Sequence, residues 1–215
     1  MKKFITYVSM QPESNLNKLN YKPVDSDDLR ADMDVYFPVS VLVGSYAKAG
    51  DSVSVICIME EGNPNIKINF ETLKKELESI CSGNGVSFDI VPVYTDKEER
   101  ASSHLKTFKN LIEAIQSKDE IYACCTYGTK PIPVLEMMAM NYAYRVRDNA
   151  SVNAVVYGKV DREGKKIKGA YLYDITSLFY MNQIVNSLAE QKVKDPDRIM
   201  KNLLGIAEDG DMTEE

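Results

Sequence analysis

The residues best suited to chemistry in this chain form a short loop after an apolar run. Ile121–Cys125 is the apolar run, and Thr126–Lys130, with the sequence TYGTK, follows it ahead of two prolines. The loop contains a glycine that allows close backbone approach, a lysine charge and two hydroxyls: Gly128, Lys130, Thr126 and Thr129. A helix that begins directly after the loop would add unpaired backbone N–H groups. Together these groups favour a phosphate as the ligand.

The loop by itself does not decide the function. A strand, a glycine-containing loop and a helix follow one another in most α/β proteins, which carry out many unrelated reactions. The sequence TYGTK matches neither the G-x-G-x-x-G fingerprint of dinucleotide-binding proteins nor the G-x-x-x-x-G-K-[ST] loop. The dinucleotide and P-loop mechanisms therefore do not follow from it.

The bulk composition restricts the class of protein. The chain has 215 residues, enough for one α/β domain with a buried core and a small appendage. Its formal charge of −6 argues against a broad surface for duplex nucleic acid, although a local cluster of donors can still hold a small anion. No apolar stretch has membrane-spanning length, and Met1–Lys3 leads into a strand-like run instead of a signal peptide. We expect a cytoplasmic protein without membrane contact.

Cysteine and histidine usage gives no sign of a metal centre. The chain has one histidine, and its four cysteines lack the spacing of zinc ligands. Three cysteines lie in strand-like runs and one near the end of a predicted helix: Cys57, Cys124, Cys125 and Cys81. We expect all of them to be reduced and buried, and we expect neither a metal nor another cofactor.

Hydrophobic patterning predicts an α/β fold. The runs rich in β-branched and aromatic residues are predicted to be strands: Lys2–Met10, Asp51–Met59, Val86–Tyr94, Ile121–Cys125, Ser151–Lys159 and Ala170–Ile175. Helical periodicity separates most of them, which is typical of a Rossmann-like, mostly parallel sheet of about six strands with helices on both faces. The charged turn Arg162–Lys168 joins the last two runs, so we expect an antiparallel hairpin at one edge. Pro92 places the third strand toward an edge or at a bulge.

Helix boundaries follow from capping residues and prolines. Helices are expected to begin at or near five positions: Pro38, a cap at Asn69, a cap at Ser103, Thr176 or Ser177, and Asp195–Pro196. A further helix follows the TYGTK loop. Its periodicity predicts a buried stripe made of Val134, Leu135, Met138 and Tyr142.

The chain is expected to have one main domain and a short extension. Residues 1–190 would form the Rossmann-like core, and residues 191–215 a helical extension with a disordered acidic tail. The passage Gln11–Asp34 is long for a connection inside a compact domain and rich in turn-forming residues. Loops of this length tend to be functional or mobile.

Three local patterns carry a family resemblance. They are Ser9–Met10 followed by NYKPV (Asn20–Val24), the loop CCTYGTKPIPV (Cys124–Val134), and AVVYG (Ala154–Gly158) with LYDIT (Leu172–Thr176). With the order of predicted elements, these patterns resemble the CARF family, the CRISPR-associated Rossmann-fold domains that sense cyclic oligoadenylates in type III CRISPR antiviral defence. The resemblance spans nearly the whole chain, and the strand–T-x-G-x-[KR]–Pro loop is its most specific part.

The resemblance implies a ligand site between two loops. In such a sheet the loops after the first strand and after Cys125 flank one crevice, where the strand order reverses. Two subunits pair about a two-fold axis so that their crevices face each other, which suits a cyclic ligand. The resemblance therefore implies a homodimer that binds cyclic oligoadenylate. The residues expected to bind it are Met10, Asn15, Asn17, Thr126, Tyr127, Gly128 and Thr129.

The resemblance also raises the question of catalysis, because standalone members of the family include ring nucleases. Their reaction is attack of a ribose 2′-OH on the adjacent phosphodiester, without metal. The resemblance implies catalytic roles for Lys130, which would stabilise the charged phosphorane, and for Ser9, which would orient the nucleophile or the phosphate. An attached HEPN ribonuclease is not expected, since Arg100 and His104 are closer together than its signature requires.

Two other functions remain open from the sequence. The chain could be a binding module that senses or sequesters the messenger and regulates a partner through its C-terminal helices. It could also be a Rossmann-like enzyme for another nucleotide. The second alternative is disfavoured, because no glycine-rich fingerprint follows the first strand, although Glu60 does end the second.

Overall fold

The computed structural model describes residues 1–205 of the chain. The chain divides into two compact units, Met1–Ser177 and Leu178–Glu215. The first unit contains the whole β-structure, and the predicted extension 191–215 lies within the second. Most of the predicted acidic tail lies outside the described residues. No helix among residues 1–205 combines the length and apolar character needed to cross a membrane.

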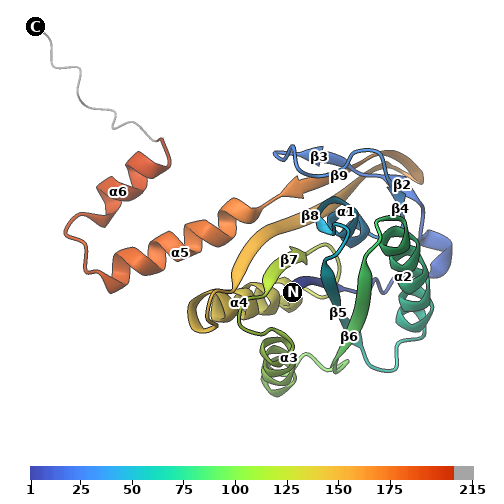
Figure 1. The fold of residues 1–215 in the computed structure, drawn as a ribbon, viewed down its shortest axis with the longest axis horizontal. Coiled ribbons are helices and arrows are strands. Elements are labelled where there is room, and N and C mark those ends of the chain that lie inside the picture. The colour runs from blue at the N-terminus through green and yellow to red at the C-terminus, as the bar shows by residue number, and fades with distance from the viewer. Residues whose placement is uncertain (206–215) are drawn as a thin grey trace, which may run out of the picture. The chain divides into compact units, whose positions relative to one another are not determined.

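The first unit is built on a seven-stranded sheet with the order β3-β9-β8-β7-β1-β5-β6 (Figure 1). Five neighbouring strands are parallel: β1 (Lys2–Tyr7), β5 (Ser52–Glu60), β6 (Ser87–Thr95), β7 (Glu120–Cys124) and β8 (Ser151–Glu163). The other two run in the opposite direction: β9 (Lys166–Asp174) and β3 (Lys22–Val24). The predicted mostly parallel sheet with an antiparallel hairpin is confirmed, as is the edge position of β6.

One prediction about the hairpin needs correction. The hairpin β8–β9 is not at the edge of the sheet, because β3 pairs with the outer side of β9. The three residues of β3 come from the long polar passage after β1, which sequence patterning left without a strand. The same passage pairs β2 (Leu19–Asn20) with β4 (Asp34–Val35) in a small antiparallel sheet. The pairing of β3 with β9 and the pairing of β2 with β4 fix this passage beside the main sheet.

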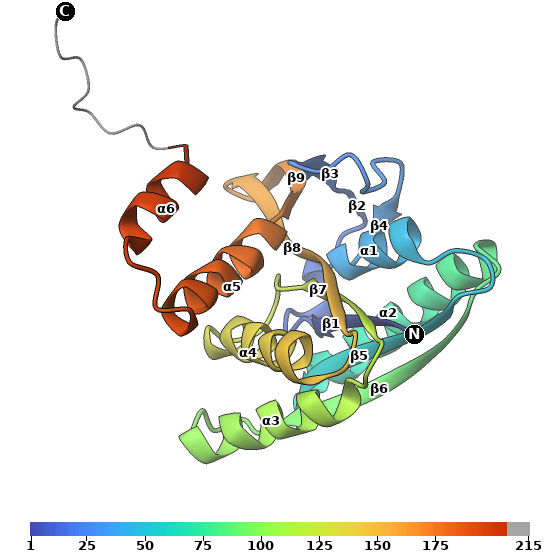
Figure 2. The ribbon, with the colours of Figure 1, turned by 60° about the vertical axis from the view of Figure 1, so that its left-hand side comes forward.

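Four helices cover the two faces of the main sheet (Figure 2). They are α1 (Pro38–Tyr46), α2 (Pro64–Gly83), α3 (Ala101–Ala114) and α4 (Pro131–Val146). From β1 the chain proceeds outward through β5 to β6, and α3 then returns it to β7 on the other side of β1. Connections between parallel strands are right-handed, so connections that lead toward β6 and connections that lead toward β8 must cross opposite faces of the sheet. Accordingly, α1 and α2 lie on one face and α3 and α4 on the other. The strand order therefore reverses between β1 and β7.

Beyond the sheet, α5 (Thr176–Glu190) and α6 (Pro196–Leu203) follow β9. The side chain of Asp195 caps α6 by accepting a hydrogen bond from the backbone N–H of Arg198 at 3.1 Å, as predicted. The starts of α1 at Pro38 and of α5 at Thr176 also agree with the sequence prediction.

The predicted caps of α2 and α3 are wrong. α2 begins at Pro64, and the side chain of Asn63 caps it by accepting from the backbone N–H groups of Asn65 and Ile66. Asn69 instead lies buried inside the helix. The sequence Asn63–Pro64 was the stronger signal for the start of this helix, because proline suits the first helical position. α3 begins at Ala101, two residues before the predicted cap.

The predicted buried face of α4 is also wrong in part. Val134 and Met138 are 58% and 48% exposed. The face against the sheet consists of Ile132, Leu135, Glu136, Ala139, Met140 and Ala143. Two alanines on this face allow the helix to lie close to the strands, so larger apolar residues are left on the outside. Apolar residues on both sides of α4 made its periodicity ambiguous.

A carboxyl group is completely buried on this face of α4. Glu136 has 0% exposure, and neither of its side-chain oxygens has a hydrogen-bond partner among the described residues. Burial raises its pKa to about 8, and the thiol of Cys125 lies beside it. Glu136 is therefore largely protonated at neutral pH. The four cysteines are free and buried, as predicted.

Glu136 should make stability depend on pH. Its folded pKa of about 8 exceeds the ordinary 4.5, so its contribution is complete below about pH 4.5 and is lost as the pH rises toward 8. Glu136→Gln cannot titrate and should become more stable relative to the wild type as the pH increases. The change in this difference should be on the order of a few kcal/mol, at about 1.4 kcal/mol per pKa unit. Urea unfolding of both proteins at about pH 5 and about pH 8.5 measures it, and equal pH dependence would contradict the assignment.

Candidate ligand pocket

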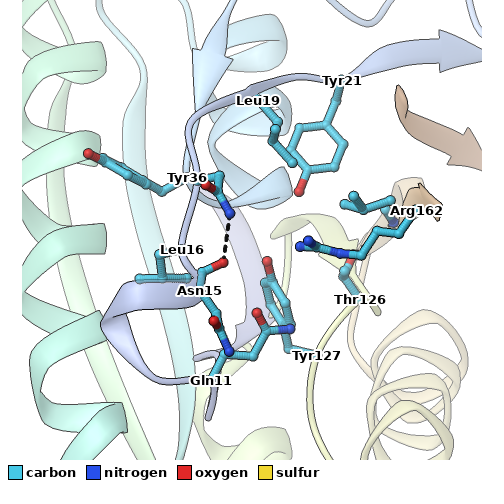
Figure 3. A pocket seen from close by; sticks show the side chains of 12 residues that line it. Gln11, Asn15, Leu16, Leu19, Tyr21, Tyr36, Thr126, Tyr127 and Arg162 are labelled. Carbon is cyan, nitrogen blue, oxygen red and sulfur yellow. Dashed lines mark hydrogen bonds between the residues drawn. The ribbon is translucent and has the colours of Figure 1, made fainter. Parts of the chain in front are cut away.

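A pocket of about 260 Å³ opens beside the reversal of the strand order (Figure 3). Five parts of the chain supply its walls: the loop after β1, the passage that contains β2, the segment between β4 and α1, the loop after β7 and the strand β8. The lining residues are Gln11, Asn15, Leu16, Asn17, Leu19, Tyr21, Tyr36, Thr126, Tyr127, Gly158, Val160 and Arg162. Ligands of open α/β sheets bind at the carboxyl ends of strands where the order reverses, so this location is the expected one.

Helix α2 holds the loop after β1 in place. The side-chain amide of Asn69 donates hydrogen bonds to the backbone oxygens of Ser9 at 2.7 Å and Gln11 at 2.8 Å. Asn65 donates to the backbone oxygen of Met10 at 3.1 Å. Asn69 is fully buried, so these hydrogen bonds are protected from competition by water. The backbone that leads Gln11 into the pocket is therefore fixed.

The loop after β7 is fixed by a hydroxyl and a glycine. The Oγ1 atom of Thr126 accepts a hydrogen bond from the backbone N–H of Gly158 at 2.8 Å and lies 3.1 Å from the Sγ atom of Cys124. Gly128 has a φ angle of +104°, and a Cβ atom there would lie 3.1 Å from the ring of Tyr7. Only glycine suits this turn. Thr126 thus extends the pairing of β7 with β8, which uses part of the hydrogen-bonding capacity predicted for a ligand.

Two tyrosines, the buried Tyr21 and the half-buried Tyr127, place their hydroxyl groups in the pocket. Tyr21 comes from the passage after β1 and Tyr127 from the loop after β7, and both hydroxyls point into the space that Figure 3 shows. Burial raises the pKa of Tyr21 to about 12 and that of Tyr127 further. Both groups therefore stay protonated and can donate. The ring of Phe37 packs edge-on against Tyr127, with centroids 6.5 Å apart, and limits its rotation.

A carboxylate on α2 positions the third tyrosine of the pocket. Glu76 accepts from the backbone N–H groups of Tyr36 at 2.7 Å and Phe37 at 3.3 Å, and from the hydroxyl of Ser40 at 2.6 Å. Burial raises the pKa of Glu76, and these hydrogen bonds oppose that effect. Because α1 has no capping side chain of its own, Glu76 binds the N–H groups at its start. The position of Tyr36 therefore depends on packing between α1 and α2.

Among the residues that the structure describes, Arg162 is the one charged residue that lines this pocket. Its side chain extends from β8 toward the space between Tyr21 and Tyr127 (Figure 3). Since no carboxylate of residues 1–205 lines the pocket, the local charge favours an anion. Sequence reasoning missed Arg162 because it assigned the residue to a turn. Strand β8 continues to Glu163, and the alternation that places Gly158 and Val160 toward the pocket extends to Arg162.

The structure brings together only part of the predicted site. Asn15, Asn17, Thr126 and Tyr127 line the pocket. The other predicted binding and catalytic residues do not: Ser9, Met10, Gly128, Thr129 and Lys130. Ser9 has 0% exposure and its hydroxyl accepts from the backbone N–H of Gln11 at 3.2 Å, while Lys130 is exposed at the start of α4. Within residues 1–205, no three histidine, cysteine or acidic side chains group in a way that could hold a metal ion.

Comparison with models of protein families and with curated proteins finds no match to this chain. The interpretation of the pocket therefore depends on its own residues and geometry.

The hydrogen bonds of Asn69 should contribute measurably to stability. Asn69→Leu keeps the branching of the side chain but leaves the backbone oxygens of Ser9 and Gln11 without their donor. The expected loss is about 1–3 kcal/mol of unfolding free energy. Lys74→Ala on the exposed side of α2 is the control and should change stability by less than about 0.5 kcal/mol. Chemical denaturation measures both, and an unchanged Asn69→Leu protein would show that other contacts hold the loop.

Proposed function

We propose that this protein binds a cyclic oligoadenylate in the pocket beside the strand-order reversal. The observation that carries the proposal is the composition of the pocket. One arginine, three tyrosines and several amide side chains converge there, without a carboxylate. An arginine suits a phosphate, and tyrosines and amides suit a base, so the pocket has the groups that a nucleotide ligand requires. The preference for a cyclic oligoadenylate comes from the CARF resemblance.

The amide and aromatic residues support adenine as the base. Asn and Gln side chains can donate to and accept from the edge of adenine at the same time. Gln11 and Asn15 lie on one side of the pocket, and the ring of Tyr127 lies between them and Arg162 (Figure 3). Asn17, which also lines the pocket, donates to the backbone oxygen of Asn15 at 3.0 Å. Tyrosine rings stack on bases in single-stranded nucleic acid sites. A base held between an amide and a ring would be recognised by both its edge and its face.

Arg162 supports the phosphate part of the ligand. A guanidinium group binds phosphate oxygens through two parallel hydrogen bonds, and such charge-assisted bonds are stronger than neutral ones. The chain has a net charge of −6, which does not attract nucleic acid as a whole. A single arginine in a concave site among uncharged donors instead favours a small ligand with few phosphates.

The size of the pocket supports binding by two chains. Pockets for drug-sized ligands have volumes of about 300–1,000 Å³, and this one has about 260 Å³. A cyclic oligonucleotide of three or more nucleotides would exceed it, whereas two facing pockets would share the ring. An isologous dimer presents the same contacts to both halves of a symmetric ligand.

Exposed apolar residues at the starts of α3 and α4 offer a surface for this dimer. The two helices run in the same direction, since Phe108 packs against Tyr142 and Arg147 donates to the backbone oxygen of Ile112. This register places Leu105 level with Met138. Leu105 and Met138 are 67% and 48% exposed, and Val134, 58% exposed, lies one turn before Met138. We propose that these three residues contribute to the contact.

The binding proposal predicts a specific effect of Arg162→Ala. Loss of a charge-assisted hydrogen bond should weaken cyclic oligoadenylate binding by about 1.5–3 kcal/mol, roughly 10- to 150-fold. Calorimetry with cyclic tri-, tetra- and hexaadenylate measures the change. Lys165→Ala removes the same charge from the tip of the same hairpin and is the matched control, for which we expect little change.

Lys130→Ala separates two positions for the phosphate site. If the phosphate lies in the pocket, this variant should bind nearly as well as the wild type. A larger loss for Lys130→Ala than for Arg162→Ala would place the phosphate at the TYGTK loop instead. Absence of binding to all three cyclic oligoadenylates would contradict the proposed function.

The dimer proposal is tested by sedimentation. The wild type should sediment as a dimer, and Met138→Glu should shift it toward a monomer because it places a charge on the apolar contact. Tyr94→Glu alters an exposed tyrosine on the edge strand β6 and should leave the dimer intact. A monomeric wild type, both free and with ligand, would contradict this part of the proposal.

Cleavage and sensing remain alternative consequences of binding. Ring cleavage by the 2′-OH would depend on Lys130 for the phosphorane charge only if the phosphate lies at the TYGTK loop, and the fully buried Ser9 could influence orientation only through the backbone of Gln11. Incubation with each cyclic oligoadenylate in the presence of EDTA, followed by chromatography, distinguishes the alternatives. Linear product would support a ring nuclease, whereas binding without product over hours would support a sensor or regulatory module.

A further inference from the structure

The hairpin that carries Arg162 has a second, chemically different face. Gly158 faces Pro38 of α1, and Val160 and Arg162 line the pocket on that same face. Because successive side chains of a strand point to opposite faces, Tyr157 and Lys159 lie on the other face of the sheet. Their cross-strand partners on β9 are Tyr173 and Tyr171, and Lys22 of β3 pairs with Tyr171 on its other side. These five residues are called the tyrosine face here.

The rings of the tyrosine face lie on a flat support. The ring centroids of Tyr171 and Tyr173 are 6.4 Å apart. A Cβ atom on Gly169 would lie 2.9–3.1 Å from the Tyr171 ring and hydroxyl, so glycine lets this ring lie against the strand. Tyr157 is 43% exposed, and Tyr171 and Tyr173 are half-buried. Each tyrosine thus retains accessible ring surface while its other side packs on the sheet.

The charge of the hairpin is opposite to that of the chain. Apart from Arg162, which faces the pocket, residues 157–173 contain four cations (Lys159, Lys165, Lys166, Lys168) and two anions (Asp161, Glu163), which gives +2, whereas the whole chain has −6. The pair of Lys159 with Asp161 at 2.9 Å is exposed on both sides. Such a surface pair contributes little and can be exchanged for a stronger anion. The hairpin therefore attracts polyanions, although the protein as a whole is acidic.

We propose that the tyrosine face binds single-stranded nucleic acid. Accessible aromatic rings on a sheet, with lysines alongside, are the arrangement on which unpaired bases stack while cations contact the phosphates. A duplex keeps its bases stacked internally and would gain nothing from the rings. A protein partner need not carry the negative charge that the lysines of the hairpin call for, whereas every nucleotide of a single strand does. The combination of rings and charge therefore selects a single strand.

This surface is independent of the ligand pocket. Arg162 points to one side of the hairpin and the tyrosine face lies on the other, so a strand on the tyrosine face need not contact the pocket residues. The inference therefore does not rest on the proposed cyclic ligand. An oligothymidylate probe separates the two, because it offers no adenine to the pocket.

The test is fluorescence anisotropy of a labelled oligothymidylate of about 12 nucleotides at low salt. We expect saturable binding that weakens with added salt. Tyr157→Ala and Tyr171→Ala should each weaken it by about 5- to 100-fold through the loss of stacking. Tyr157→Phe keeps the ring and should bind as the wild type does, which also guards against loss of folding. Tyr94→Ala removes an exposed tyrosine on another strand and should have no effect.

Four results would overturn the proposal. The first is the absence of binding at low salt by the folded wild type. The second is binding that survives both alanine substitutions, which would place the strand elsewhere. The third is a change of sedimentation in the alanine variants without a change in oligothymidylate binding, which would identify the tyrosine face as a contact between protein chains. Full competition by saturating cyclic tetraadenylate would likewise assign the probe to the pocket.

Discussion

The reversal of strand order between β1 and β7 is the constraint on which the site depends. Right-handed crossovers send α1 and α2 to one face and α3 and α4 to the other, so the loops after β1 and β7 diverge and leave space between them. That space must still be given rigid walls. Asn69 fixes the first loop and Thr126 ties the second to β8, both through hydrogen bonds to backbone groups. The topology of the sheet thus creates the pocket, and polar side chains make its walls rigid.

The sequence predicted the strands well because their signals are local. Each apolar run formed a strand, and the proline in β6 marked an edge. It failed where tertiary packing decides. Asn69 has the residue type of a helix cap, but its role as a donor to a distant loop depends on how α2 packs against β1. Val134 and Met138 are as apolar as the residues that α4 buries, and only contact with the sheet determines which side is inside.

The candidate site was predicted in outline for the same reason. Thr126 and Tyr127 were identified because their loop follows a strand, and Asn15 and Asn17 because the family resemblance implies base contacts; all four line the pocket. Arg162 was missed, since its place depends on how far β8 continues beyond the sheet core. That length is set by pairing with β9, and the short strand β3 extends the support further. One hairpin thereby presents an arginine to the pocket and tyrosines to the opposite face.

Photocrosslinking with azidoadenine-substituted cyclic tetraadenylate is the most direct test of nucleotide binding at the strand-order reversal. The modified peptides can be located by mass spectrometry, with unlabelled ligand as competitor. Nucleotide binding in this pocket predicts competitor-sensitive labelling of the peptides that contain Tyr21 and Tyr127, which come from distant parts of the sequence but share the pocket. Competitor-sensitive labelling confined to another crevice, such as the one lined by Glu61 and Tyr94 beside β6, would contradict it.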